Sequence, residues 1–325
     1  MFGLSYSSCN LCPNDCNVNR EIEELGICGQ SDKLKIAWAG LHKGEEPPIS
    51  GDNGSGMIFF TGCSLHCRYC QNYQISTDNI GYEISEKDLS DIMLKLQHMG
   101  AHTLNLVTGT HFIPSIINAL DMAKALGLKL PVVWNSSGYE KVSVLSILDE
   151  YIDFYLLDAK TLSSKTASVF CGTEEYVKYI IPVLDFLYNK KRNNKVIIRH
   201  LVFPGELEST IKFLDFFSEN YKKKFLLSLM VQFVNPYVNN PCVNNPNVNN
   251  SNSISNLKDK RGLDNKITEK EYGMLLDLLD KYEIDGFFQI MDDKEDDKEE
   301  LWIPDFTKKN PFPEDFATPL NMDIS

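Results

Sequence analysis

The chain has 325 residues, of which 43% are hydrophobic and 11% aromatic, so it can build one large globular domain, or one domain with small appendages, and is not disordered overall. Its 45 acidic and 32 basic residues give a net charge of −13, which argues against general binding to nucleic acid or to anionic membranes. No apolar run is long enough to cross a membrane, and residues 1–10 lack the order of a signal peptide. We therefore expect a cytoplasmic protein with no nucleic-acid or membrane partner.

Residues 1–50 are predicted to form a cysteine-rich N-terminal extension. It contains Cys9, Cys12, Cys16 and Cys28. A reducing compartment disfavours disulfides, so we interpret these thiols as metal ligands. Four thiolates close the coordination of a metal site, which is either an iron–sulfur cluster that relays electrons or a structural zinc. Their spacing is compatible with both chemistries.

A second group of cysteines follows the first predicted strand, Met57 to Phe60. Cys63, Cys67 and Cys70 are separated by three and by two residues. Three thiolates leave one iron of a four-iron cluster open to an exogenous ligand. A zinc site completed by His66 is the alternative, but its spacing is unlike that of common zinc ligand pairs.

From residue 51 to 290 the sequence repeats a strand-then-helix pattern. Ser85 with Asp88 predicts the start of the first helix, and Gly100 its end. Six such units predict an α/β fold that is either an open doubly wound sheet or a partial barrel. We predict the partial (βα)6 TIM-like barrel. The strands are expected at 57–60, 103–107, 131–134, 153–157, 196–198 and 225–230.

Polar residues follow these strands. In both architectures the carboxyl ends of the strands carry the active site, so these are the residues to examine. They are Thr108–His111, Asn135–Gly138, Asp158–Lys160, Arg199–His200 and Gln232.

Two segments are expected to lie outside the barrel. Residues 235–265 repeat Val-Asn-Asn-Pro, and such a composition buries too little apolar area to offset chain entropy, so we predict a disordered insert. Residues 291–325 are predicted to form a C-terminal tail whose acidic run, Asp292 to Glu300, is a solvated loop. Cys242 is interpreted as incidental, and Cys171, which has no partner nearby in the sequence, as an ordinary thiol.

The C-x3-C-x2-C motif after a first barrel strand, with an aromatic residue before its last cysteine, resembles the radical S-adenosylmethionine (SAM) superfamily. The loop end Cys70-Gln71-Asn72 resembles, more narrowly, the pyruvate formate-lyase activating enzyme and its uncharacterised iron–sulfur relatives. The likeness runs from the N-terminal cysteines to Phe306 without the insert. In those relatives a similar cysteine stretch precedes the barrel, and Leu11-Cys12-Pro13 and Gly26-Ile27-Cys28-Gly29 fit it.

The resemblance implies a [4Fe-4S] cluster on Cys63, Cys67 and Cys70 whose open iron binds SAM. A zwitterionic sulfonium needs Arg or Lys for its carboxylate and carbonyls or Asp for its ammonium. Two departures weaken the inference about substrate: Thr108–His111 replaces the usual Gly-Gly-Glu-Pro, and Asn135 replaces an acidic residue. The implied SAM-binding residues are Tyr69, Asn72, Thr108, Gly109, Thr110, Asn135, Ser136, Asp158, Lys160 and Arg199.

The function implied is a radical SAM oxidoreductase that reduces the sulfonium by one electron and releases a 5'-deoxyadenosyl radical. Its partners would be a one-electron donor such as flavodoxin or ferredoxin and, for an activating enzyme, a glycyl-radical protein. A rival hypothesis keeps the chemistry but assigns a peptide, nucleotide or small-metabolite substrate. Another is a non-catalytic iron–sulfur or zinc protein, although the polar strand ends argue against a mere scaffold.

Overall fold

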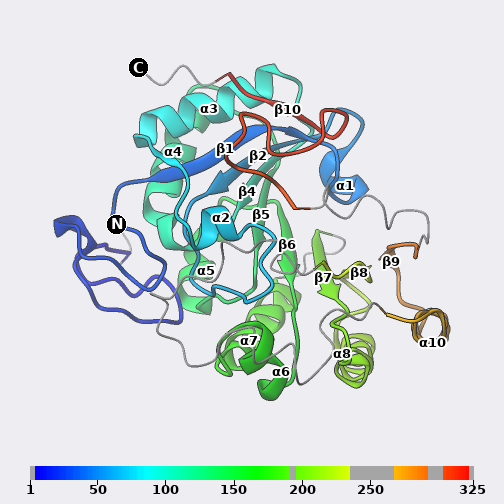
Figure 1. The fold of residues 1–325 in the computed structure, drawn as a ribbon. Helices are drawn as coiled ribbons and strands as arrows, with labels where there is room; N and C mark the ends of the chain where they lie inside the picture. Colours follow the sequence, from blue (N-terminus) through cyan, green and yellow to red (C-terminus); the bar gives the residue numbers. More distant parts are fainter. Residues whose placement is uncertain (1–3, 191–194, 235–266, 292–302, 322–325) are drawn as a thin grey trace.

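The computed structural model describes residues 4–190, 195–234, 267–291 and 303–321, and within them the strands form one ten-stranded sheet (Figure 1). Its order is β10-β1-β2-β4-β5-β6-β7-β8-β9, with β3 paired to β1. The predicted insert and the acidic run 292–300 lie outside the described residues. The strands are β1 (Lys35–His42), β2 (Ser55–Phe60), β3 (Tyr82–Glu83), β4 (Leu104–Val107), β5 (Val132–Ser136), β6 (Phe154–Asp158), β7 (Val196–Leu201), β8 (Leu226–Met230), β9 (Gly286–Phe288) and β10 (Ala317–Pro319).

The helices follow the strands in alternation. Ser85 and Asp88 form the predicted capping box at the start of α3, and Gly100 follows its end with a φ of +85°. None of the helices in the described part of the chain has the length and apolar character needed to span a bilayer. They are α1 (Pro47–Ser50), α2 (Tyr73–Ser76), α3 (Glu86–His98), α4 (Ile113–Ala125), α5 (Val142–Leu148), α6 (Ser164–Phe170), α7 (Tyr176–Asn189), α8 (Leu207–Asn220) and α10 (Glu269–Tyr282), with 3-10 turns η1 (Arg20–Ile22) and η2 (Thr110–Phe112).

The six predicted strands are β2 and β4 to β8, and they pair in parallel in chain order. Because the strand order never reverses, right-handed crossovers bring the connecting helices to one face of the sheet, where Figure 1 shows α3, α4, α5, α7 and α8. This arrangement is a partial barrel rather than a doubly wound sheet. Within the described residues the end strands β10 and β9 do not pair, so the sheet is open.

The sheet also recruits both predicted flanking segments. The predicted extension 1–50 contributes β1, which pairs antiparallel with β2, and the predicted tail contributes β10, which pairs antiparallel with β1. β9 adds a seventh parallel strand beside β8. These strands were not predicted, because no helix-period segment follows β1 or β10 to mark a βα unit and the edge strands β9 and β10 have only three residues each.

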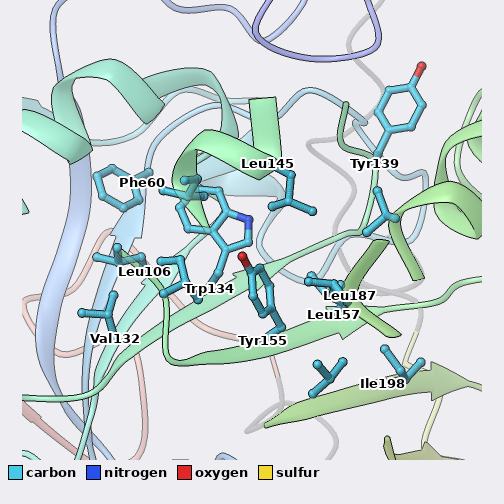
Figure 2. Packing of buried hydrophobic residues seen from close by; sticks show 14 of the residues in the cluster. Phe60, Leu106, Val132, Trp134, Tyr139, Leu145, Tyr155, Leu157, Leu187 and Ile198 are labelled. Atoms are coloured by element: carbon cyan, nitrogen blue, oxygen red, sulfur yellow. The ribbon is translucent and has the colours of Figure 1, made fainter. Parts of the chain in front are cut away.

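The main hydrophobic core lies between the sheet and its helices. Figure 2 shows Trp134 of β5 among Phe60, Leu106 and Leu145, with Tyr155 close by. The indole Nε1–H of Trp134 donates to Glu140 (3.0 Å), so the one polar atom of the largest core side chain has a hydrogen-bond partner.

The opposite face of the parallel strands points into the barrel. Ile49 of α1 packs there against Val133, Leu156 and Ile197. Because side chains alternate along a strand, the residues two positions further on, Asn135, Asp158 and Arg199, share this inner face at the carboxyl ends of β5, β6 and β7.

Candidate active site

The three cysteines of the C-x3-C-x2-C motif lie on the loop between β2 and α2. Each is a partly buried free thiol. The backbone N–H of Leu65 donates to Cys63 Sγ (3.4 Å), and the Ser76 hydroxyl donates to Cys70 Sγ (3.4 Å). We refer to residues 61–72 as the cluster loop.

Burial governs the chemistry of these thiols. It raises the pKa of Cys63 above its usual value and that of Cys70 to about 12. Buried thiols become thiolates when a metal supplies positive charge, and hydrogen bonds to sulfur then stabilise the thiolate. Three soft sulfur donors with N–H and O–H partners fit an iron–sulfur cluster that keeps one iron open.

Cys171, the C-cap of α6, corrects the expectation of a thiol without a partner. It is fully buried and hydrogen-bonds with Cys67; this bond is the largest cause of the raised pKa of Cys67, followed by burial. The two residues are far apart in sequence, so only the packing of α6 against the cluster loop reveals the contact.

An ion-pair network occupies the carboxyl ends of β5, β6 and β7. The Arg199 guanidinium donates from Nε to Asp158 Oδ1 (2.8 Å), from Nη2 to Asn135 Oδ1 (2.6 Å) and from Nη1 to Glu45 Oε2 (3.4 Å). Lys160 Nζ donates to Asp158 Oδ2 (3.0 Å). Four predicted residues therefore meet at one place. The fifth residue, Glu45, was not predicted, because the segment before α1 carries no motif and reaches the site only by entering the barrel.

The charges in this network compensate one another. Burial would raise the pKa of Asp158, but the cations of Arg199 and Lys160 outweigh it and hold that pKa below its usual range. Asp158 likewise keeps Lys160 charged against the cost of burial. Glu45 differs, because burial outweighs the attraction of Arg199 and raises its pKa to about 7.

Lys160 links the network to the cluster loop. Its Nζ lies 5.5 Å from the centre of the Tyr69 ring, and the ring packs edge-on against Phe203 with centroids 4.9 Å apart. The Tyr69 hydroxyl is buried without a hydrogen-bond partner in the described residues. Asn72 donates its backbone N–H to Cys70.

The residues after β4 and at the end of β5 mostly face the core. The Thr110 hydroxyl donates to Glu140 Oε1 (2.9 Å), and Ser136 Oγ accepts from the backbone N–H of Gly138 (3.2 Å). A Cβ at Gly109 would lie 2.6 Å from Ile116 Cδ1 and 3.0 Å from the Trp134 ring, so a larger residue there would require these core side chains to shift. Of this predicted group, Thr108 is only partly buried, and its φ of +59° is unusual for a β-branched residue.

Two buried groups below this loop were not predicted as site residues. Burial raises the pKa of Glu140 despite its hydrogen bonds from Trp134, Ser136 and Thr110. The neighbouring His111 bonds through Nε2 to the Thr61 carbonyl (2.7 Å), and burial lowers its pKa to about 3, so it is a neutral packing residue.

The four N-terminal thiols come together beside the cluster loop. Burial raises the pKa of Cys12 to about 12, and Cys28, Cys16 and Cys9 are close enough to add to the effect. Within the ranges that the structure describes, no three His, Cys, Asp or Glu side chains already stand in position around a single ion. A cubane iron–sulfur cluster needs its cysteine ligands further apart than a single ion does, because each cysteine sulfur binds a different iron.

Comparisons with known proteins include one family match, one curated relative and two similar crystal structures. The Radical SAM superfamily profile matches residues 57–217. Uncharacterized protein MJ0674 of Methanocaldococcus jannaschii is 28% identical over 292 residues, which cover 86% of this chain and 76% of that protein. Two crystal structures of Streptococcus suis SuiB, one bound to S-adenosylmethionine, match at 16% identity with TM-scores of 0.45 and 0.46. They cover 74% and 71% of this chain, which spans 47% of each SuiB chain.

The matched segment begins in β2 and ends in α8, so it contains the cluster loop and every member of the ion-pair network except Glu45. The family implies a [4Fe-4S] cluster and SAM as cofactors. Three thiols on the loop after the first parallel strand, with a charged network at the adjoining strand ends, meet that requirement. Residues 57–217 of this chain therefore match the Radical SAM superfamily.

Proposed function

We propose that this radical SAM enzyme activates a partner protein by removing a hydrogen atom from a backbone glycine. The observation that carries the SAM site is the position of Lys160, which pairs with Asp158 in the network and lies against Tyr69 of the cluster loop. The ion-pair network of Arg199, Asp158 and Lys160 therefore adjoins the loop that would hold the iron–sulfur cluster. The loop end Cys70-Gln71-Asn72, which resembles the activating enzymes, supports the choice of substrate.

The charged and polar residues of the network suit the two charged groups of SAM. Arg199 and Lys160 offer positive charge to the SAM carboxylate, while Asp158 and the Asn135 oxygen offer acceptors to its ammonium group. In the superfamily that the motif resembles, the residue at the position of Tyr69 lies against the adenine of SAM, and the apolar rings around Tyr69 would exclude water there. When bound, the iron–sulfur cluster supplies the electron that cleaves SAM into methionine and a 5'-deoxyadenosyl radical.

The open sheet supports a large substrate. Because β9 and β10 do not pair within the described residues, the barrel wall is incomplete, and a loop of a partner protein can approach through such a gap. A closed eight-stranded barrel would admit substrate only through its ends.

The first prediction tests cleavage of SAM. Anaerobically prepared protein with dithionite should produce 5'-deoxyadenosine, and Cys67→Ala should abolish that product because the cluster loses one of three ligands. Product is measured by chromatography, with Cys242→Ser as a control that removes a different thiol. Wild-type yields from Cys67→Ala would overturn the assignment.

Activation is tested separately. A glycyl-radical protein added to the reaction should gain a glycyl-radical signal in electron paramagnetic resonance, in proportion to the SAM consumed. Formation of 5'-deoxyadenosine without that signal would refute the activating role and leave a peptide, nucleotide or small metabolite as substrate.

A further inference from the structure

The N-terminal cysteines are packed directly on the cluster loop. We call residues 9–30 the thiol module. The Asn14 side-chain Nδ2–H donates to the Ser64 carbonyl (2.6 Å), and the His66 ring hydrogen-bonds through Nε2 with the Ile27 carbonyl (2.9 Å). Two loops that each carry metal-binding residue types are therefore held against each other.

The two loops also approach closely at Gly62, the residue before Cys63. Its φ is +88°, and a Cβ added there would lie 2.7 Å from the Cys28 carbonyl oxygen and 2.6 Å from Gln30 Cγ. Backbone bearing one N-terminal thiol thus contacts backbone bearing a cluster ligand. Such contact gives a short path for an electron between metal centres bound to the two groups of thiols.

Each sulfur of the thiol module accepts an N–H hydrogen bond. Hydrogen bonds of this kind stabilise thiolates and tune the potentials of iron–sulfur clusters. Cys12 and Cys28 accept from the backbone two residues later, as Cys63 and Cys70 do in the cluster loop. The donors are Asn14 for Cys12, Gln30 for Cys28, Ile27 for Cys16 (3.3 Å) and Arg20 Nη1 for Cys9 (3.6 Å).

Arg20 places a buried positive charge beside this group. The residue is fully buried, and its Nη1 also donates to the His111 carbonyl (2.7 Å) while Nε donates to the Gln30 carbonyl (3.0 Å). A buried guanidinium needs a compensating negative charge. Thiolates bound to a metal centre at Cys9 would supply it.

We propose that Cys9, Cys12, Cys16 and Cys28 bind a second iron–sulfur cluster that passes electrons to the cluster loop. The relay role rests on the proposed function, whereas the metal site does not. A low-potential one-electron donor protein loses one electron to the second cluster. That cluster is reoxidised as the cluster on Cys63, Cys67 and Cys70 gains the same electron, and no bond or proton changes. Zinc could not serve, because it has no redox chemistry.

Metal content tests the site. The full chain is reconstituted anaerobically with iron and sulfide, and iron, sulfide and zinc are measured. Wild type should hold about eight iron atoms per chain, and a variant with Cys63, Cys67 and Cys70 replaced by Ala about four, with a cluster signal in electron paramagnetic resonance after reduction. About four irons in wild type, or zinc in the triple variant, would overturn the proposal.

Electron transfer tests the relay. Replacing Cys12 and Cys16 by Ser should halve the iron content and slow reduction of the loop cluster by reduced flavodoxin at least tenfold. Dithionite should still reduce that cluster, because a small reductant bypasses the relay. Cys242→Ser is the matched control, and circular dichroism verifies folding. If flavodoxin reduces the loop cluster of the double variant as fast as that of wild type, the relay is disproved. If dithionite-reduced wild type does not cleave SAM, the proposed function is refuted instead.

Discussion

Arg199 shows how one side chain organises the site. Its guanidinium reaches Asp158, Asn135 and Glu45 at once, which a lysine with one point charge could not reproduce. Asp158 and Arg199 are opposite each other in the β6–β7 register, so the pair follows from the alignment of two parallel strands. Glu45 enters the same group from the segment before α1 and is the least favourably placed charge.

The raised pKa of Glu45 predicts a pH dependence of stability. Its pKa is about 7 in the folded protein and about 4.5 when exposed, so between these values the folded state holds a proton that the unfolded state has lost. The contribution of Glu45 to stability therefore falls as the pH rises from about 4.5 to about 7. Glu45→Gln, which resembles the protonated form, should melt a few degrees higher than wild type at pH 8 and converge with it near pH 5.

Thermal melting of the SAM-free protein at several pH values checks this prediction. Glu208→Gln is the control, because it removes the same charge from an exposed position on α8. Parallel curves for wild type and Glu45→Gln across this pH range would show that Glu45 titrates normally.

At the level of elements, one close contact between the thiol module and the cluster loop requires a glycine, Gly62. Gly62→Ala should lower the free energy of unfolding by about 2 kcal/mol more than Gly127→Ala. Both positions have positive φ, +88° and +99°, but a Cβ at Gly127 meets nothing within 4 Å. The difference between the variants thus isolates the close contact with Cys28 and Gln30 from backbone strain.

Urea unfolding of both variants under anaerobic conditions measures that difference. Equal destabilisation by the two substitutions would mean that the close contact at Gly62 contributes nothing to stability.

At the level of the whole molecule, the barrel is expected to tolerate loss of the Asn-rich segment. Deleting residues 238–255 should leave iron content and SAM cleavage at wild-type levels, because Asn and Pro at this density offer little apolar area to a core. Soluble yield, iron per chain and 5'-deoxyadenosine are the measurements. Insoluble or inactive protein would identify the segment as a folded part of the enzyme.

The parallel strands and their helices could be predicted from sequence because periodicity and caps are local. Each parallel strand, each helix, the Ser85–Asp88 capping box and the cluster loop is a continuous segment, so its signal can be read without tertiary information. The Asp158, Lys160 and Arg199 positions also follow locally, as polar residues at strand ends.

Tertiary structure alone decided which of these residues meet. Glu45 joins Arg199, Cys171 joins Cys67, and Cys28 reaches Gly62, each across a long stretch of chain. In the folded protein Thr110 bonds to Glu140 and not to the ion-pair network, and β1 and β10 join the parallel strands in one sheet. The sequence pattern of a local segment predicts which of its side chains are buried. Which residues of distant segments contact them depends on the packing of the complete fold.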